Sequence, residues 1–195
     1  MALINRLPFV SAGIDAVVAQ SERRLMDEAA FQAFYSRTSG PVFGYLRRLT
    51  GNGGVAEDLL QDAYVRFLAA SRLPEDDEHR KNYLYRIATN LARDHFRRKR
   101  TEDDAGGRLS VSDSENTNPG VVSACFDTWD LLTRISPRDR ELLVLAYVEG
   151  MTHQEIAGVT GLVRASIKPL LFRARRRFAA VLDAAGLAPL ERSRS

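Results

Sequence analysis

The sequence predicts an all-α protein built from two small helical domains that a flexible linker joins. Apolar residues recur at three- and four-residue steps through most of the chain, and no alternating strand pattern of useful length is present. The segment 101–120, TEDDAGGRLSVSDSENTNPG, is rich in Gly, Ser, Asn and Asp and nearly lacks large apolar residues, which is typical of a linker. The chain has 195 residues and a hydrophobic content of 45%, enough for a core in each domain.

Amphipathic segments predict the first helices of the first domain. One segment begins near Ala30 and is expected to be interrupted at Gly40-Pro41, and the glycine-rich run 51–54 then breaks the chain. The next segment, AEDLLQDAYVRFL (56–68), has an apolar face, and the acidic side chains of its first turns favour the positive end of a helix. A polar loop, SRLPEDDEHRKN (71–82), is expected to follow.

The segment 83–100, YLYRIATNLARDHFRRKR, predicts a helix with two different faces. One face is an apolar stripe suited to a core, made of Leu84, Ile87, Ala88, Leu91 and Ala92. The other face is cationic with an aromatic residue at its start, and comprises Tyr83, Arg86, Asn90, Arg93 and Arg97, with the basic run continuing through Arg98 to Arg100. Arg offers forked donors to phosphate and aromatic rings stack on bases, so this face favours a nucleic-acid ligand. The alternative is a solvated face that only keeps the helix soluble.

The second domain carries the pattern of a helix-turn-helix. Ser136 and Pro137 predict the start of a helix that Gly150 ends, and the capping box from Thr152 to Glu155 predicts a short helix after it. Gly161 permits a tight turn, and a basic helix is expected to begin near Arg164. A short helix, a glycine turn and a basic helix favour DNA binding over a generic helical hairpin.

Composition limits the class of protein. Lys and Arg outnumber Asp and Glu by 16 to 12 in residues 1–100 and by 11 to 6 in residues 131–195, whereas residues 101–130 hold one basic and seven acidic residues. The lone cysteine, Cys125, allows no intramolecular disulfide, and no apolar run approaches a membrane span, so we expect a cytoplasmic protein without membrane insertion. The three histidines are dispersed without metal-ligand spacing and no catalytic cluster stands out. We therefore expect no enzyme, cofactor, metal or small-molecule substrate.

Three of these segments, in this order, resemble the extracytoplasmic-function (ECF) sigma factors of the sigma-70 family. AEDLLQDAYVRFL resembles that family's polymerase-binding segment, NYLYRIATNLARDHFRRKR its −10 element segment, and ISPRDRELLVLAYVEGMTHQEIAGVTGL its −35 reading domain. The resemblance implies an N-terminal extension (1–26), a sigma-2-like domain (27–100), the acidic linker (101–120), a sigma-4-like domain (121–184) and a C-terminal tail (185–195). It also implies core RNA polymerase, promoter DNA and an anti-sigma factor as partners.

The same resemblance implies roles for individual residues. Polymerase binding would fall to Asp58, Gln61 and Asp62. Recognition and melting of the −10 element would fall to Tyr83, Arg86, Asn90, Arg93, Arg97 and Arg98, with the loop from Pro74 to Lys81 at the place where the family captures a flipped base. Recognition of the −35 element would fall to Arg164, Ser166 and Lys168, with Arg173 and Arg176 as phosphate contacts.

Two departures from the family pattern bear on these roles. Pro169 stands where the family has a small polar residue, so the recognition helix either begins late or is bent, and Leu170 and Phe172 are then expected to pack on a core or a partner. The loop PEDDEH (74–79) is unusually acidic for a segment that binds a DNA strand. Both features favour a rival interpretation, a sigma-like decoy that sequesters an anti-sigma factor without binding promoters. A nuclease is a second, weaker rival.

Overall fold

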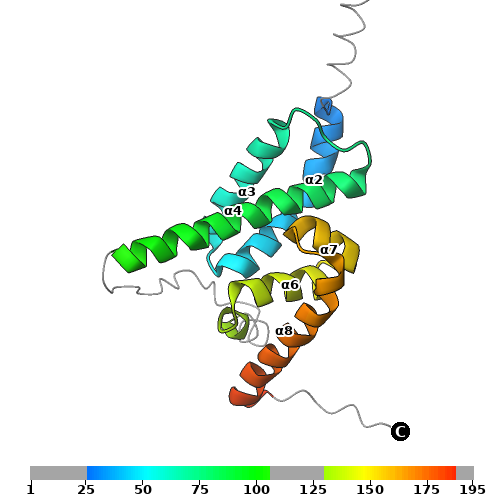
Figure 1. Cartoon of the computed structure of the whole chain (residues 1–195). Coiled ribbons are helices and arrows are strands. Elements are labelled where there is room, and N and C mark those ends of the chain that lie inside the picture. Colours follow the sequence, from blue (N-terminus) through cyan, green and yellow to red (C-terminus); the bar gives the residue numbers. More distant parts are fainter. Residues whose placement is uncertain (1–25, 106–129, 188–195) are drawn as a thin grey trace, which may run out of the picture.

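The structure is a computed structural model, and it describes residues 26–105 and 130–187 (Figure 1). All regular elements within these ranges are helices. Most of the N-terminal extension and of the acidic linker, the end of the C-terminal tail, and Cys125 lie outside the described residues. No helix in the described ranges is both long enough and apolar enough to cross a membrane.

Three helices form the first domain: α2 (Glu28–Thr50), α3 (Gly53–Leu68) and α4 (Asp77–Ala105). Each packs against the other two. Between α2 and α3, Gly51 adopts a φ of 72°, which a side chain would disfavour, and Asn52 caps α3 by accepting a hydrogen bond from the backbone N–H of Val55.

The expected interruption at Gly40-Pro41 is wrong, because α2 runs through Pro41 without a break. Its buried residues keep helical spacing on both sides of the proline, from Phe34 through Val42 to Leu49. Packing of this continuous apolar stripe against α3 and α4 outweighs the backbone hydrogen bond that Pro41 cannot donate.

The expected polar loop 71–82 is also too long, because α4 already begins at Asp77. The apolar stripe of α4 is confirmed: Leu84, Ala88, Leu91 and Ala92 are buried and Ile87 is half-buried. Phe34 and Phe67 stack in the core of the domain with ring centroids 5.1 Å apart.

The second domain consists of α6 (Pro137–Tyr147), α7 (His153–Thr160) and α8 (Arg164–Ala184). The predicted caps are confirmed, because Ser136 caps α6 and Thr152 and Glu155 form both bonds of a capping box. Gly161, with a φ of 73°, makes the turn into α8. This arrangement is a helix-turn-helix.

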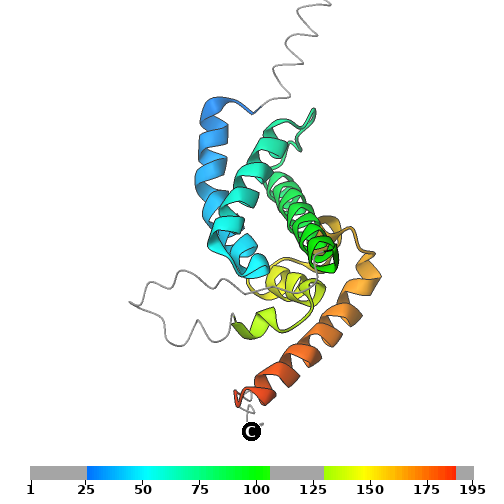
Figure 2. The same ribbon diagram turned by 90° about the vertical axis from the view of Figure 1, so that its left-hand side faces the viewer.

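The two domains lie against each other. In Figures 1 and 2, α7 lies along α4 and α6 lies at the end of α2, and contacts join both helix pairs. Arg140, a buried residue of α6, donates to the carbonyl oxygens of Leu132 and Thr133 in its own domain and of Leu49 at the end of α2. The sequence pattern predicts two domains, but nothing in it predicts this contact.

Candidate nucleic-acid and polymerase interfaces

The cationic face of α4 is largely open to solvent. Arg86, Asn90 and Arg97 are exposed and follow one another at steps of four and seven residues, so they form a row along the helix. Arg98 is exposed beside this row, and Tyr83 at its start is half-buried, with its ring 6.1 Å from that of Phe67. The row presents fixed donors and an aromatic edge, as contact with a DNA strand requires.

Arg93 differs from the other candidates, because its guanidinium group is bound to the second domain. Nη2 lies 2.6 Å from Oε1 of Glu141 and Nε lies 3.0 Å from Oε2, while Nη1 donates to the carbonyl oxygen of Thr160 at 3.0 Å. At about 100° per residue, Arg93 is rotated by about 40° from Arg97 and lies within about 20° of Asn82. Arg93 therefore lies on the boundary between the solvent-exposed row and the interface with the second domain.

Glu141 is the buried partner in this pair, with a side chain only 5% exposed, against 40% for Arg93. Burial raises the pKa of Glu141, and the two hydrogen bonds and the positive charge of Arg93 oppose that rise without cancelling it. Removal of either partner would leave the other without its best counter-charge.

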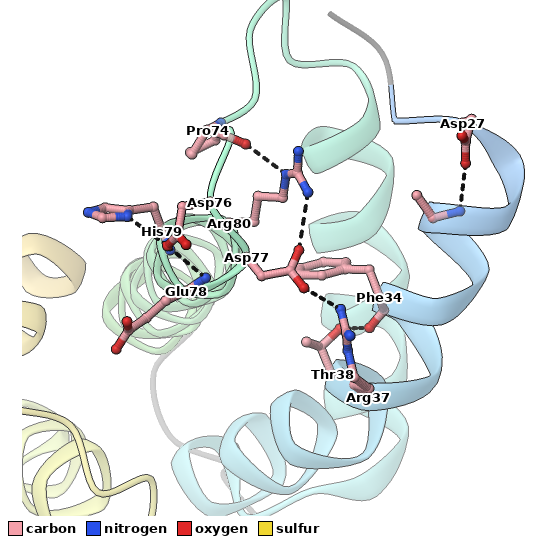
Figure 3. A network of polar contacts seen from close by, with 11 residues as sticks. Asp27, Phe34, Arg37, Thr38, Pro74, Asp76, Asp77, Glu78, His79 and Arg80 are labelled. Atoms are coloured by element: carbon pink, nitrogen blue, oxygen red, sulfur yellow. Dashed lines mark hydrogen bonds and ion pairs between the residues drawn. The ribbon is translucent and has the colours of Figure 1, made fainter. Parts of the chain in front are cut away.

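The acidic segment that leads into α4 contributes two carboxylates to contacts within the fold (Figure 3). Asp76 accepts hydrogen bonds from the backbone N–H groups of Glu78 and His79, both at 3.0 Å, and so caps α4. Asp77 bridges Arg37 of α2 at 2.6 Å and Arg80 at 3.1 Å. These contacts explain two of the acidic residues that are unusual for a strand-binding loop.

The three candidate polymerase contacts lie on one side of α3. Asp58, Gln61 and Asp62 are all exposed, and their spacing places them on a common face. An apolar neighbour of this face was not expected from the sequence: Val65 is 65% exposed. Leu68, the last residue of the apolar pattern in 56–68, is 44% exposed. The surface of α3 thus combines carboxylates with apolar area, as a protein interface commonly does.

The structure places all five −35 candidates on the surface of α8. Arg164, Ser166, Lys168, Arg173 and Arg176 are exposed. The helix begins at Arg164 and continues through Pro169, so it does not begin late. Leu170 is half-buried against the core, as expected, whereas Phe172 is 53% exposed.

The sequence pattern also did not indicate a set of buried charged residues at the start of α6, two of which, Arg140 and Glu141, contact the first domain. Asp139, Arg140 and Glu141 are three consecutive charged residues, and all three are buried. Charges at the start of the apolar run LLVLAY are the one local signal that these side chains have partners. Their partners could not be read from the sequence, because they lie up to 91 residues away.

Each domain presents a surface suited to DNA. Within the described ranges, no three His, Cys, Asp or Glu side chains gather as a metal site would require. An exposed cationic row on one domain and a helix-turn-helix with a basic second helix on the other define a two-domain DNA-binding protein.

Comparison with known proteins identifies the family. Residues 34–102 match the family model of sigma-70 region 2, and residues 126–178 match that of sigma-70 region 4. SigK of Mycolicibacterium vanbaalenii, an ECF RNA polymerase sigma factor, is 30% identical over 84% of this chain and 86% of its own. CarQ of Myxococcus xanthus, an RNA polymerase sigma factor, is 29% identical over 85% of this chain and 94% of its own. The chain belongs to the ECF sigma factors, which bind core RNA polymerase and direct it to promoters.

Solved structures show the same fold. The sigma factor RpoE, in complex with the anti-sigma factor NepR from Bartonella quintana, superposes with a TM-score of 0.63 over 78% of this chain and 96% of its own, at 21% identity. CnrH, in complex with the cytosolic domain of CnrY, superposes with a TM-score of 0.59 over 85% of this chain and 94% of its own, at 24% identity.

Proposed function

We propose that this sigma factor divides its work among three helices: α3 binds the polymerase, α4 binds the −10 element and α8 binds the −35 element. The single observation that carries the proposal is the exposed row of Arg86, Asn90 and Arg97 along α4, within the region that matches sigma-70 region 2. On α3 the contacts are Asp58, Gln61 and Asp62. On α8 they are Arg164, Ser166, Lys168, Arg173 and Arg176. The remaining −10 contacts are Tyr83, Arg93 and Arg98.

Promoter opening is then a matter of binding equilibrium, without covalent catalysis. Extrusion of a base from the duplex costs a few kcal/mol of free energy. Stacking of that base on an aromatic side chain offsets about 1–3 kcal/mol of this cost per base. A surface that binds separated strands better than duplex shifts the promoter toward the open state. Tyr83, half-buried at the start of the row, supplies the aromatic edge for this step.

We further propose a cytoplasmic protein under the control of an anti-sigma factor. The domain limits are residues 27–100 and 121–184, with the acidic segment 101–120 between them. Two structural neighbours, RpoE and CnrH, are seen in complexes with NepR and with the cytosolic domain of CnrY. The likeness of fold supports a comparable partner for this chain.

Transcription in vitro with core polymerase and a library of promoter templates tests the proposal. We expect specific transcripts, and we expect Arg86→Ala with Arg97→Ala to weaken promoter complexes and to reduce the dependence of affinity on salt, because fewer counterions are released. Glu28→Gln, an exposed site in the first turn of α2, is the control and should transcribe as the parent does. No specific transcript from any template, together with tight binding of an anti-sigma factor, would identify the decoy instead.

A further inference from the structure

The outward side of α8 carries apolar residues that the proposed −35 contacts do not include. At about 100° per residue, Ala165, Pro169 and Phe172 lie within about 60° of one another around the helix. All three are exposed, and Phe172 is 53% exposed. They lie about 150° around the helix from the buried side that Ile167 and Leu171 form. These three residues, called here the apolar strip, therefore face away from the core of the second domain.

The apolar strip lies on the part of α8 that is expected to enter a DNA groove. α8 is the second helix of the helix-turn-helix and packs on α6 and α7 (Figure 1). The second helix of such a unit enters the major groove, with residues of its N-terminal part at the base edges. Side chains of a helix lean toward its N-terminus, so Phe172 is expected to cover the turn of Lys168 and Pro169. The ring of Phe172 is thus directed toward the part of α8 that contacts bases.

Positive charge borders the apolar strip, which favours DNA as the partner that covers it. Lys168 and Arg173 are exposed on its two sides. Nε of Arg173 donates to the carbonyl oxygen of Pro169 at 3.3 Å, so this guanidinium group lies beside the strip. The only acidic residue of α8 is Asp183, in its last turn. An apolar strip between two lines of positive charge is complementary to a groove between two phosphate backbones.

The chemistry of the major groove offers one apolar group to such a strip. All four base pairs present hydrogen-bond donors or acceptors at the groove edge, and thymine alone adds a C5-methyl group. The side chains of Ala165, Pro169 and Phe172 have no hydrogen-bonding atom. A polar base edge against them would lose water without gaining a hydrogen bond, which costs free energy. The strip therefore favours thymine, whose methyl group alanine and phenylalanine can contact.

We infer that Phe172 is a specificity-determining residue for −35 recognition that contacts the C5-methyl group of a thymine, with Ala165 as a second methyl contact. This inference rests on the proposed function of α8. It deepens that function, because the phosphate contacts of Arg173 and Arg176 carry no sequence information directly. The two methyl contacts lie about 10 Å apart along the helix axis, which corresponds to at most about three base-pair steps.

Removal of methyl groups from the DNA tests the inference without a change in the protein. Holoenzyme, formed from this chain and core polymerase, first selects templates from a library randomised in the −35 region. Each thymine of the selected −35 sequence is then replaced by uracil, which lacks only the methyl group, and the dissociation constant is measured. We expect a loss of about fourfold at one or two positions, the effect of one buried methyl group. At those positions, 5-methylcytosine should bind better than cytosine.

Variants of α8 separate methyl recognition from general DNA contact. Phe172→Ala should abolish the preference for thymine over uracil at one of the sensitive positions, and should bind the thymine template about tenfold more weakly than the parent does. Phe172→Leu keeps an apolar side chain and should retain part of the preference. Arg176→Ala removes a phosphate contact, so it should weaken binding to both templates and leave their ratio unchanged. Because Phe172 is more than half exposed, its variants should unfold at nearly the parent's temperature.

The outcomes distinguish failure of this inference from failure of the proposed function. Unchanged affinity for every uracil template overturns the methyl contact, and so does a selected −35 sequence without thymine. A thymine preference that persists at every position in Phe172→Ala also overturns it. If that variant instead binds core polymerase more weakly, the ring contacts a protein.

The proposed −35 role of α8 has its own readout in the same experiment. If Arg176→Ala weakens binding to the selected templates, that role stands whatever the uracil templates show. If no −35 sequence is enriched and Arg176→Ala binds as the parent does, the −35 role of α8 is refuted, and the methyl contact with it.

Discussion

Arg177 and Asp139 join the last long helix of the chain to the first turn of α6. Nη1 of Arg177 lies 2.9 Å from one carboxylate oxygen of Asp139 and 2.8 Å from the other. Asp139 is buried and also accepts from the hydroxyl of Ser136 at 2.8 Å. Arg177 thus has a structural role, although it lies in a run of three arginines on a helix that is expected to bind DNA.

Arg177→Ala should destabilise the protein without removing a direct DNA contact. The change leaves a buried carboxylate with only Ser136 and the helix N-terminus as partners, and we expect a loss of about 1–2 kcal/mol in the free energy of unfolding. Arg176→Ala is the matched control on the same helix. Because Arg176 is exposed, its loss should leave stability unchanged while weakening binding to −35 duplex DNA. Equal stability of the two variants in urea denaturation would contradict the structural role.

This pair illustrates what the sequence could and could not predict. Periodicity, caps and turn glycines predict α3, α4, α6, α7 and α8, because those signals act within one or two turns of helix. Which of Arg175, Arg176 and Arg177 carries an ion pair depends on the approach of α6, 38 residues away in the chain. The same applies to Arg93, whose partner Glu141 lies 48 residues away.

Tyr45 and Thr89 should show strong energetic coupling in the core of the first domain. Their hydroxyl groups are buried and lie 2.8 Å apart. We expect Tyr45→Phe to cost about 1–3 kcal/mol, because it leaves the hydroxyl of Thr89 without this partner. The double variant Tyr45→Phe/Thr89→Val should lose less than the sum of the single variants, which a double-mutant cycle of thermal unfolding measures. Strict additivity would mean that the two hydroxyls do not depend on each other.

Pro169 should be a source of instability in α8. It lies inside a helix that starts five residues earlier, so the carbonyl of Ala165 has no backbone donor from position 169. We expect Pro169→Ala to raise the free energy of unfolding by about 2 kcal/mol, since alanine restores the bond and has the highest helix propensity. Pro137→Ala is the control, because a proline in the first turn of a helix is well tolerated there. It should change stability by only a few tenths of a kcal/mol, in the opposite direction.

Changed DNA binding in Pro169→Ala would show whether the proline also shapes recognition. Pro169 and Phe172 share the exposed side of α8 with Arg176. A stabilised variant with unaltered promoter selection would mean that the proline affects only the helix. A shift in the preferred −35 sequence would mean that it sets the position of the contacting side chains.

The N-terminus of α4 should fray in acid. The backbone N–H and ring of His79 are the largest of the contacts that lower the pKa of Asp76, and the backbone N–H of Glu78 adds to them. A lowered pKa means that ionised Asp76 stabilises the fold at pH values above the usual pKa of Asp. This stabilisation is lost as the pH falls through the lower pKa of the folded state.

Hydrogen exchange of the amides of Glu78 and His79, compared with amides in the middle of α4, measures the effect. We expect protection at the N-terminus to fall first as pH is lowered, after correction for intrinsic exchange. Asp76→Asn keeps a capping oxygen without a charge to titrate, so its protection should be insensitive to the same change in pH. Equal pH dependence in Asp76→Asn would assign the fraying to another group.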